Sequence, residues 1–569
     1  MMAVASLTTL ASLLNLANLR APGFVGRAYG PLSIRVTFLG PVADLTLLAA
    51  TTVGLAALTA LKEAKAGLLI VPTVLIYVLA PRLLPLAALA ALVYYAKAYG
   101  LGEAAKGFVT GLIGLELCAL ARWLIYPVYP NPPYAEITWR PAWDEAALFF
   151  ALNILSPYLV TGLFLSWVPA LIKALRRREV KARKEGRGGL GALCLALLAS
   201  ASVAAYPLLP TVNPGVHVGV DVPSYIYTVR QIVDKPDLRS FVRACLLGEG
   251  VKPAFYNYKY DRPLFLFLTS SFLKLTGIDV DLFFDLLPLF LAPFFVLAVY
   301  YLIKGYVGEA TMKLALMLAA TSYVITVGIY AGFYANWLGL SVGLLYLRGL
   351  VDLLEAGRPR GLAATIAASL SCLLIHPYTW IVLSAVALVY LLISLRWIRL
   401  KGLLVGLGVL AASASLPLAY DAFRLASGAR YSLVWDVFWR NASIGLKGYI
   451  SLSYWDSLIR TLHVYVSGFI SNPYLLLASA AGVLTARGGN PLERLLLAWT
   501  AVGLALALPL PTSMQIRVIY DYPCYLAAAL GLARCLRGDV GLRRTALYFF
   551  LLANLNYALR CAANVVAPT

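Results

Sequence analysis

The basic run KALRRREVKARKEGR, Lys173 to Arg187, decides how this chain is threaded through a membrane. It holds eight Lys or Arg residues and is the densest positive cluster in the sequence. Cytoplasmic loops of multi-span membrane proteins carry an excess of Lys and Arg. We therefore place this run in the cytoplasm and let the spans on both sides of it alternate.

The composition is that of a membrane protein. Of the 569 residues, 61% are hydrophobic and 13% are charged, and the mean hydropathy is +0.81. A bilayer core about 30 Å thick needs about 20 apolar residues per helical span, and such stretches recur along the chain. The sequence predicts an all-α polytopic membrane protein with about 16 transmembrane helices, short loops and two longer outward loops that carry surface helices.

The basic residues, which give a net charge of +21, are dispersed through short loops. Nucleic-acid binding would gather them on one face, so we expect no nucleic-acid partner. The seven cysteines show no CxxC spacing and mostly lie in apolar runs, so no metal or disulfide framework follows from them. These features predict a multi-pass protein of the cell membrane, in contact with membrane lipids.

Apolar stretches mark the expected spans on either side of the basic run. Those before it lie near 43–61, 66–80, 83–98, 105–126 and 148–172. Those after it lie near 189–209, 280–303, 313–330, 336–352, 361–377, 379–394, 401–419, 468–486, 493–510, 522–536 and 545–562. The pair at 66–98 is either a tight hairpin or a re-entrant pair. We predict an N-terminal transmembrane module of unknown role (1–172), a basic cytoplasmic linker (173–188) and a larger transmembrane module (189–569).

The distribution of charge supports this alternation of spans. The six segments expected inside hold 22 Lys or Arg in 66 residues; they are 173–187, 304–313, 348–360, 394–402, 487–494 and 534–544. The three loops expected outside hold 13 in 114 residues; they are 210–262, 420–467 and 511–523. A shift of one span would invert this difference.

The outward loop 210–262 contains the segment HVGVDVPSYIYTVRQIVD, His217 to Asp234. Asp221 followed by Pro223 is typical of a helix start, because Asp is a favoured N-cap and Pro is tolerated in the first turn. The helix is amphipathic and suited to the membrane surface. Its apolar stripe consists of Ile226, Val229, Ile232 and Val233. Asp221 is either simply a cap or a positioned carboxylate that can take a proton or bind a metal ion.

A second segment, DRPLFLFLTSSFLKLTG (Asp261 to Gly277), has an apolar run that is short for a span. It either packs beside the outward loop or dips into the membrane. An acid that opens a surface helix, then this segment, then alternating spans, resembles the GT-C membrane glycosyltransferases. These include the protein mannosyltransferases, the aminoarabinose and arabinose transferases, and the oligosaccharyltransferases. The resemblance covers residues 189–562 and rests on layout and short motifs.

The resemblance implies that module 189–569 is a GT-C-like glycosyltransferase in which Asp221 is the catalytic acid. Asp221 would act as general base on an acceptor hydroxyl, or as the ligand of a divalent cation. The family often carries two acids close together there, whereas only Asp221 lies in the immediate motif here. Whether a metal ion is used therefore stays open, with Asp221 as its candidate ligand.

Two residues at other outward span ends also fit the resemblance. His376, in LIHPY, is similar to His-Pro motifs of some GT-C enzymes and is a second catalytic candidate. The alternative is a histidine bonded to backbone at a Pro-broken helix end. Arg517, in PTSMQIRVIYDYP, resembles the basic residue that GT-C enzymes keep against the donor phosphate, and a guanidinium suits a pair of phosphate oxygens. The alternative is an interfacial snorkelling arginine.

Three further residues need an interpretation. Arg262, in the second segment, and Tyr520, after Arg517, are candidate substrate-binding residues. For Tyr520 the alternative is an aromatic-belt residue at the membrane interface. Asn336, in the tetrapeptide YANW at an outward span end, is interpreted as part of interfacial packing.

The sequence thus predicts an inverting membrane glycosyltransferase. Its donor is expected to be a polyprenyl-phosphate sugar, because the site opens outside, away from cytoplasmic nucleotide sugars, and its acceptor a protein, lipid or glycan. One alternative is a transporter or flippase for a lipid or solute, which predicts broken spans and ionisable residues near mid-membrane. Another is a polymerase or ligase of lipid-linked glycans, which would rely on Arg and His more than on an acid. Charges cluster at span ends and in outward loops, which favours the transferase.

Overall fold

The computed structural model describes residues 52–100, 189–208, 219–252, 262–356, 361–429, 473–507 and 512–535, apart from a few positions within these ranges, and isolated positions elsewhere. Every regular element in this part of the chain is a helix. The basic run at 173–187 and the predicted spans at 105–126 and 148–172 lie outside the described residues, and of the predicted span at 545–562 only isolated positions are described.

Six helices of the described part are long and apolar enough to cross a membrane, judged by length and composition. They are Leu190–Leu208, Val280–Ile303, Glu309–Ala331, Tyr334–Glu355, Pro377–Ser394 and Leu400–Ala426. Each coincides with a predicted span, which confirms the all-helical class and supports an integral membrane protein. The count of about 16 spans reaches beyond the described residues and stays a prediction.

The chain divides into two compact units, of which the first comprises Met1–Arg178, Arg534–Arg560 and Pro568–Thr569. Its described elements are η1 (Ala64–Leu69), α3 (Ile70–Leu79) and α4 (Leu84–Tyr99). Helices α3 and α4 pack on each other across a short turn, and Leu84 and Ala88 are buried there against Ile76 and Tyr77. Both predicted alternatives for 66–98, the tight hairpin and the re-entrant pair, contain such a pair of packed helices, and the choice between them stays a prediction.

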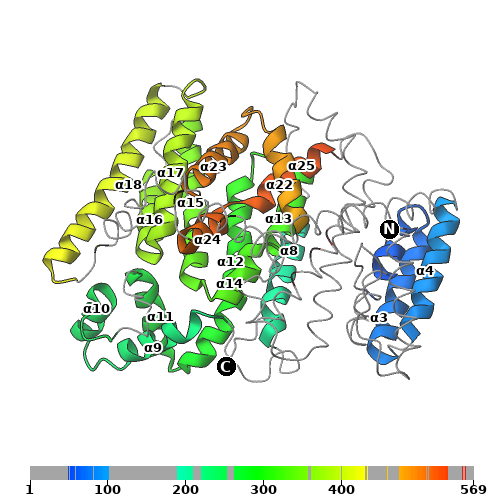
Figure 1. Cartoon of the computed structure of the whole chain (residues 1–569), viewed down its shortest axis with the longest axis horizontal. Helices are drawn as coiled ribbons and strands as arrows, with labels where there is room; N and C mark the ends of the chain where they lie inside the picture. Colours follow the sequence, from blue (N-terminus) through cyan, green and yellow to red (C-terminus); the bar gives the residue numbers. More distant parts are fainter. Residues whose placement is uncertain are drawn as a thin grey trace, which may run out of the picture. The chain divides into compact units, whose positions relative to one another are not determined.

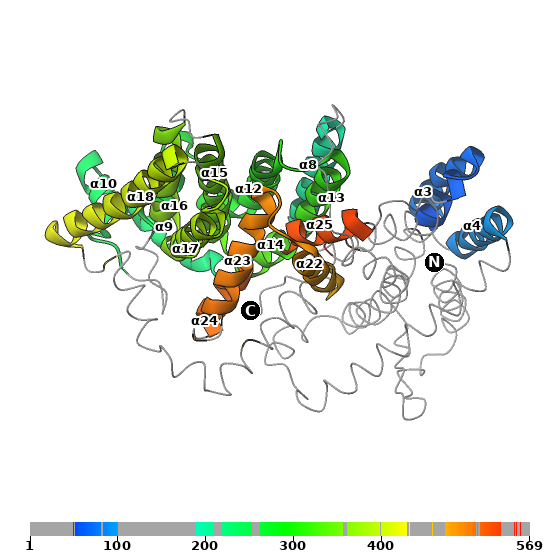
Figure 2. The same cartoon turned by 90° about the horizontal axis from the view of Figure 1, so that it is seen from above.

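The second unit, Glu179–Ala533 with Cys561–Ala567, contains the other helices. They are α8 (Gly189–Ala205), η3 (Tyr206–Leu208), α9 (Val222–Val233), α10 (Leu238–Leu247), α11 (Pro263–Thr276), α12 (Val280–Ile303), α13 (Glu309–Ala320), α14 (Tyr323–Ala331), α15 (Tyr334–Ala356), α16 (Leu362–Ile375), α17 (Pro377–Ser394), α18 (Leu400–Ala426), α22 (Pro473–Thr485), α23 (Pro491–Ala507), α24 (Thr512–Asp521) and α25 (Cys524–Cys535). Helices α8, α12, α15, α16 and α18 follow one another side by side (Figure 2). Against this row pack α13, α17 and, beyond α17, α23.

Helices α9, α10 and α11 pack on one another at one end of this unit (lower left in Figure 1). The apolar stripe of α9 is largely as predicted, since Ile226, Val229 and Ile232 are buried. It differs from the prediction in what it covers. The stripe packs on α11 and α12. It is therefore buried against apolar faces of the same protein and not against lipid. Helix α11 thus takes the alternative in which it packs beside the outward loop.

The end of α11 is held to the end of α9 by the residues of the motif FLKLTG. The Lys274 ammonium donates to the carbonyls of Val233 and Lys235, over 3.1 Å and 2.6 Å. These carbonyls lie at the C-terminus of α9, where a cation is stabilised by the helix dipole. Gly277 ends α11 with φ +67°, a left-handed conformation that favours glycine. The motif therefore has a structural function here.

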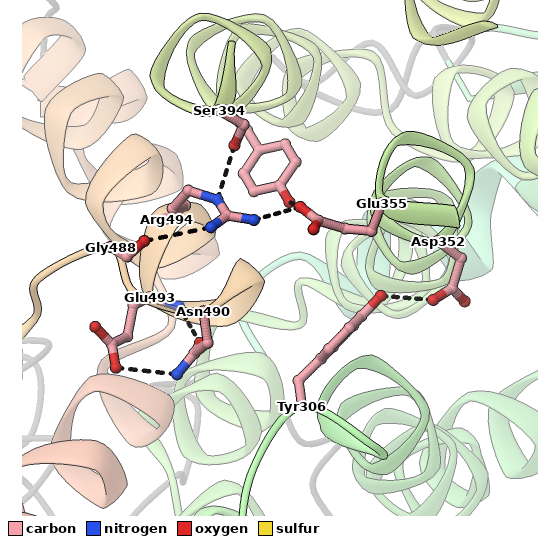
Figure 3. Close-up of polar contacts among 9 residues, drawn as sticks. Tyr306, Asp352, Glu355, Ser394, Gly488, Asn490, Glu493 and Arg494 are labelled. Atoms are coloured by element: carbon pink, nitrogen blue, oxygen red, sulfur yellow. Dashed lines mark hydrogen bonds and ion pairs between the residues drawn. The ribbon is translucent and has the colours of Figure 1, made fainter. Parts of the chain in front are cut away.

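The opposite end of the second unit is held by polar side chains at four helix connections (Figure 3). Arg494, at the start of α23, pairs with Glu355 at the end of α15. It also donates to the Ser394 hydroxyl at the end of α17, over 3.0 Å. Tyr306, between α12 and α13, donates to the Asp352 carboxylate of α15 over 2.5 Å. These contacts tie the four connections to one another.

The two ends of the unit agree with the alternation predicted from charge. The connections joined by Arg494 and Tyr306 fall in the segments expected inside: 304–313, 348–360, 394–402 and 487–494. The connections expected outside also contact one another; they precede α9, separate α14 from α15 and α16 from α17, and surround α24. Segments predicted to share a side of the membrane therefore meet in space.

Candidate functional site

Asp221 lies in a turn that is bonded to the end of another helix. The backbone N–H groups of Val220 and Asp221 donate to the carbonyls of Tyr330 and Ala331, each over 3.0 Å, at the C-terminus of α14. Gly219 permits this approach, because its φ is +110° and a Cβ atom there would lie 2.8 Å from a backbone oxygen of α14. The position of Asp221 is therefore fixed by backbone contacts with α14.

Asp221 stands immediately before α9 but does not cap it. Its backbone is already helical (φ −85°, ψ −11°), and its side chain accepts no capping hydrogen bond. Asp237 shows the contrast, since it caps α10 and accepts from the Ser240 hydroxyl at 2.7 Å and the Ser240 N–H at 2.8 Å. These bonds lower the pKa of Asp237. Helix capping therefore does not account for the half-buried carboxylate of Asp221.

Arg517 of α24 lies against two aromatic rings from other helix connections. Its guanidinium carbon is 5.7 Å from the ring centroid of Phe333, between α14 and α15, and 5.0 Å from that of Tyr378, in the first turn of α17. Both distances are within the range of cation–π attraction. The side chain is half-buried, so it is held by packing while it remains accessible at this junction.

His376 caps α17 and is 1% exposed. Its Nδ1 atom accepts the backbone N–H of Thr379 over 3.3 Å, and Pro377 occupies the first helical position. The predicted alternative, a histidine bonded to backbone at a Pro-broken helix end, is therefore what the structure shows. The imidazole also lies 5.7 Å from the Tyr378 ring, which contacts Arg517. The cap and the predicted catalytic role of His376 are compatible, because the hydrogen bond that caps the helix also fixes the position of the ring.

Three polar residues that the sequence did not single out as a site form a cluster with His376 through Thr379. The Thr379 hydroxyl oxygen lies 2.9 Å from His376 Nδ1 and 3.3 Å from Asp521 Oδ1, and it bonds Asn336 Oδ1. All three residues are at least nine-tenths buried. The interpretation of Asn336 as interfacial packing therefore misses a buried polar contact. An available signal was the position of Asp521, one helical turn after Arg517.

Helix α24 is anchored to its neighbours by several hydrogen bonds. The Tyr323 hydroxyl of α14 donates to the Ile519 carbonyl over 2.7 Å, and Gln515 donates to the last carbonyl of α23, also over 2.7 Å. The Tyr520 hydroxyl donates to the Val324 carbonyl over 2.8 Å, and this side chain is 1% exposed. Tyr520 thus helps to hold α24 on α14, and its role in substrate binding stays a prediction.

Arg262 lies at the start of α11 and is 4% exposed. Its guanidinium donates to the Tyr225 hydroxyl of α9 and lies 5.5 Å from the centre of that ring. Tyr225 in turn stacks on Phe284 of α12, with ring centroids 5.8 Å apart. These contacts connect α9, α11 and α12, so the structure shows a packing function for Arg262. Its predicted contact with substrate stays a prediction.

Asp221, His376 and Arg517 belong to one junction of helix ends. Phe333, which contacts Arg517, is two residues beyond Ala331, to which Asp221 is bonded. His376 is two residues before Tyr378, the other ring beside Arg517. The junction is built from the start of α9, the end of α14, the start of α17 and α24.

Within the described part of the chain, no three His, Cys, Asp or Glu side chains come together. A Mg²⁺ ion can be held by one or two carboxylates together with substrate phosphates, so Asp221 as a metal ligand stays a prediction. The mechanism proposed for the junction uses no metal ion.

No protein-family model and no curated protein sequence matches the chain. Among solved structures, it is similar to the Archaeoglobus fulgidus oligosaccharyltransferase in the apo form, with 14% identity and a TM-score of 0.42 over 67% of this chain and 56% of that one. It is also similar to the archaeal oligosaccharyltransferase AglB from Archaeoglobus fulgidus in complex with an inhibitory peptide and a dolichol-phosphate, with 14% identity and a TM-score of 0.43 over the same shares. The chain thus spans little more than half of these proteins. A likeness at this level assigns no activity.

Proposed function

We propose that the chain is a GT-C-like membrane glycosyltransferase that moves a sugar from a polyprenyl-phosphate donor to an acceptor on the outward face of the membrane. The observation that carries the proposal is that Asp221, His376 and Arg517 each belong to one junction of helix ends. An acid, an imidazole and a guanidinium can supply the base, the hydrogen bond and the positive charge that this transfer needs. The charge pattern of the sequence supports an outward position for the junction.

Arg517 binds the donor phosphate in this proposal. A guanidinium presents planar pairs of N–H groups that match two phosphate oxygens. The rings of Phe333 and Tyr378 lie on part of the guanidinium, and the lower local polarity strengthens its interaction with a charge. As the bond between sugar and phosphate breaks, negative charge grows on the phosphate, and Arg517 stabilises that charge.

Asp221 acts as the base. Its carboxylate accepts the proton of the acceptor hydroxyl while the hydroxyl oxygen bonds to the anomeric carbon of the sugar. The bond from this carbon to the phosphate oxygen breaks, and its electron pair stays on the polyprenyl phosphate. Attack opposite the leaving group inverts the anomeric configuration. The acceptor hydroxyl belongs to a protein, a lipid or a glycan.

Sugar transfer by the purified full chain in lipid nanodiscs, with a panel of polyprenyl-phosphate sugars and hydroxyl acceptors, tests the proposal. Asp221→Asn should lower the rate by about 10²–10⁴-fold, because the general base is lost. The matched control is Asp234→Asn, an exposed acid at the other end of α9, which should leave the rate unchanged.

The outcomes separate the alternatives. If Asp221→Asn keeps the rate while Arg517→Ala abolishes it, the chain works as a ligase or polymerase of lipid-linked glycans and Asp221 is not the base. If no donor supports transfer but reconstituted vesicles show flux of a lipid or solute, the chain is a transporter and the proposal is wrong.

A further inference from the structure

The hydrogen bonds of Thr379 determine whether Asp521 carries a proton. The Thr379 hydroxyl oxygen has three polar neighbours, and a hydroxyl has one hydrogen to donate. The hydrogen can bond only one of Asn336 Oδ1, His376 Nδ1 and Asp521 Oδ1 at a time, and Asp521 Oδ1 is the most distant of the three. An ionised carboxylate can only accept hydrogen bonds. Asp521 Oδ1 lies 3.3 Å from this oxygen, and when the hydroxyl hydrogen bonds a closer acceptor, Asp521 keeps its bond to Thr379 as a protonated acid that donates.

The second carboxyl oxygen of Asp521 leads to the same conclusion. Its Oδ2 atom is buried and has no hydrogen-bond partner among the described residues. Burial of an ionised carboxylate with an unsatisfied oxygen costs far more than burial of the neutral acid. Burial raises the pKa of Asp521 well above its usual value, and the bond from Thr379 and the charge of Arg517 oppose this less strongly. The other titratable groups around it are His376, Cys372, Tyr520 and Tyr525.

The same cluster fixes the state of the His376 ring. Because Nδ1 accepts the backbone N–H of Thr379, this nitrogen carries no hydrogen. A neutral His376 must then carry its hydrogen on Nε2. In this form the ring can donate a hydrogen bond from Nε2, and Nδ1 is not available to take a proton from a substrate.

We propose that Asp521 is a positioning residue that, as a neutral carboxylic acid, donates to Thr379, so that the two residues hold His376 as a hydrogen-bond donor at Nε2. Only the catalytic consequence rests on the proposed glycosyltransferase function. A neutral Asp521 also leaves the positive charge of Arg517, one helical turn earlier, for the phosphate of the donor.

Infrared spectroscopy of the full chain in lipid nanodiscs tests the protonation of Asp521. The difference between wild type and Asp521→Asn at neutral pH should contain the C=O band of a protonated carboxyl group. The matched control is Asp421→Asn, because the buried Asp421 is paired with Arg424 at 3.5 Å and should contribute an ionised carboxylate. An ionised carboxylate band for Asp521 would overturn the proposal.

The state of His376 is measured by ¹⁵N NMR of the histidine-labelled chain. The sequence has three histidines, so replacing His217 and His463 by Gln leaves one ring. We expect a bare Nδ1 and a protonated Nε2, with the same pattern in Asp521→Asn, whose amide still donates to Thr379. Asp521→Ala should mix the two tautomers. A hydrogen on Nδ1 in the wild type, or an unchanged pattern in Asp521→Ala, contradicts the proposal.

Sugar transfer then shows whether the position of His376 matters for function. Asp521→Ala should lower kcat by about 10²-fold, as misplacement of an active-site group does. Asp521→Asn should keep most of kcat, because the neutral donor is retained. An equal loss in both variants would mean that the carboxylate charge is used, and the proposal would be wrong. If the wild type transfers no sugar, the proposed function fails, while the infrared and NMR results still decide the state of Asp521 and His376.

Discussion

Arg517 combines a permanent charge with two aromatic neighbours, Tyr378 at 5.0 Å and Phe333 at 5.7 Å. A cation over an aromatic ring is stabilised by about 0.5–1 kcal/mol when exposed and by more when water is excluded. The rings also fix the plane of the guanidinium, and hence the direction of its N–H groups. A lysine would keep the charge but lose both the stacking and the paired donors.

We therefore expect Arg517→Lys to raise the KM for the lipid-linked donor by about tenfold, which corresponds to about 1.4 kcal/mol of binding free energy. The measurement is sugar transfer at varied donor concentration. Arg243→Lys is the control, because Arg243 is exposed and pairs with Glu249 at 3.2 Å on α10. Equal KM values for wild type and Arg517→Lys would exclude a paired contact with phosphate.

The neutral Asp521 gives stability a defined pH dependence. Its pKa is raised in the folded chain, so the folded state binds this proton more tightly than the unfolded state does. The contribution is fully present below the unfolded pKa of about 3.9 and is lost as the pH rises through the folded value. Asp521→Asn removes this titration. The thermal unfolding midpoint of the variant should fall less than that of wild type from acidic to alkaline buffer, and parallel curves would refute the assignment.

At the scale of elements, the start of α9 is joined to the end of α14 by backbone hydrogen bonds. Gly219 and Gly332 both have positive φ, and their backbones lie so close that a Cβ atom on Gly219 would be 2.9 Å from Gly332 Cα. The consequence is that the position of Asp221 follows the position of α14. Since α14 ends two residues before Phe333, the position of this helix also affects the ring beside Arg517, the proposed phosphate-binding residue.

Gly219→Ala should break this coupling. An alanine at positive φ costs about 1 kcal/mol in backbone strain, and its Cβ atom must also displace α14 or the turn. Gly277→Ala is the matched control, because φ is +67° there and a Cβ atom would meet open space. Both variants should lose thermal stability, but only Gly219→Ala should lose sugar transfer. Equal transfer rates would show that the contact does not position Asp221.

The elements differ in how far their sequence predicts them. The spans at α12 and α15 follow from long apolar runs, and the apolar stripe of α9 follows from helical spacing. What α9 packs against could not be predicted, because a stripe of this kind fits a helix of the same protein as well as a membrane surface. The contact between Lys274 and the end of α9 also joins residues that local patterns do not relate.

The candidate site shows the same limit more sharply. Asp221, His376 and Arg517 could be singled out, since each is a charged or titratable residue at the predicted outward end of an apolar segment. Thr379 is separated from Asn336 by 43 positions and from Asp521 by 142. Only the packing of α15, α17 and α24 brings these three residues together. From the sequence alone, a polar residue such as Asn336, next to a tryptophan at a span end, is interpreted as part of interfacial packing.

At the scale of the whole molecule, the second unit has two distinct ends. The connections joined by Arg494, Glu355 and Tyr306 lie at one, and the junction of α9, α14, α17 and α24 lies at the other. The long helices run from one end of the unit to the other. If one connection is located on a given side of the membrane, the sides of all the other connections follow from it. The charge pattern predicts that the junction lies outside.

Labelling of single cysteines with a membrane-impermeant maleimide in intact cells tests this orientation. In a chain whose own cysteines are replaced, Arg239→Cys, exposed on α10, should be labelled. Ala310→Cys, exposed near the start of α13, should react only after the membrane is permeabilised. The reverse pattern would place the junction in the cytoplasm, where nucleotide sugars are available, and would exclude the proposed donor.

The most direct measurement of whether the junction binds a donor phosphate is photo-crosslinking of a polyprenyl phosphate that carries a photoreactive group beside its phosphate. The full chain in lipid nanodiscs is irradiated with this probe, and the modified residues are mapped by mass spectrometry. We predict crosslinks within 332–334, 376–380 and 512–521, which disappear in Arg517→Ala and in the presence of excess unlabelled polyprenyl phosphate. Crosslinks confined to the opposite connections, at 304–313 and 487–494, or unaffected by loss of Arg517, would contradict the proposed site.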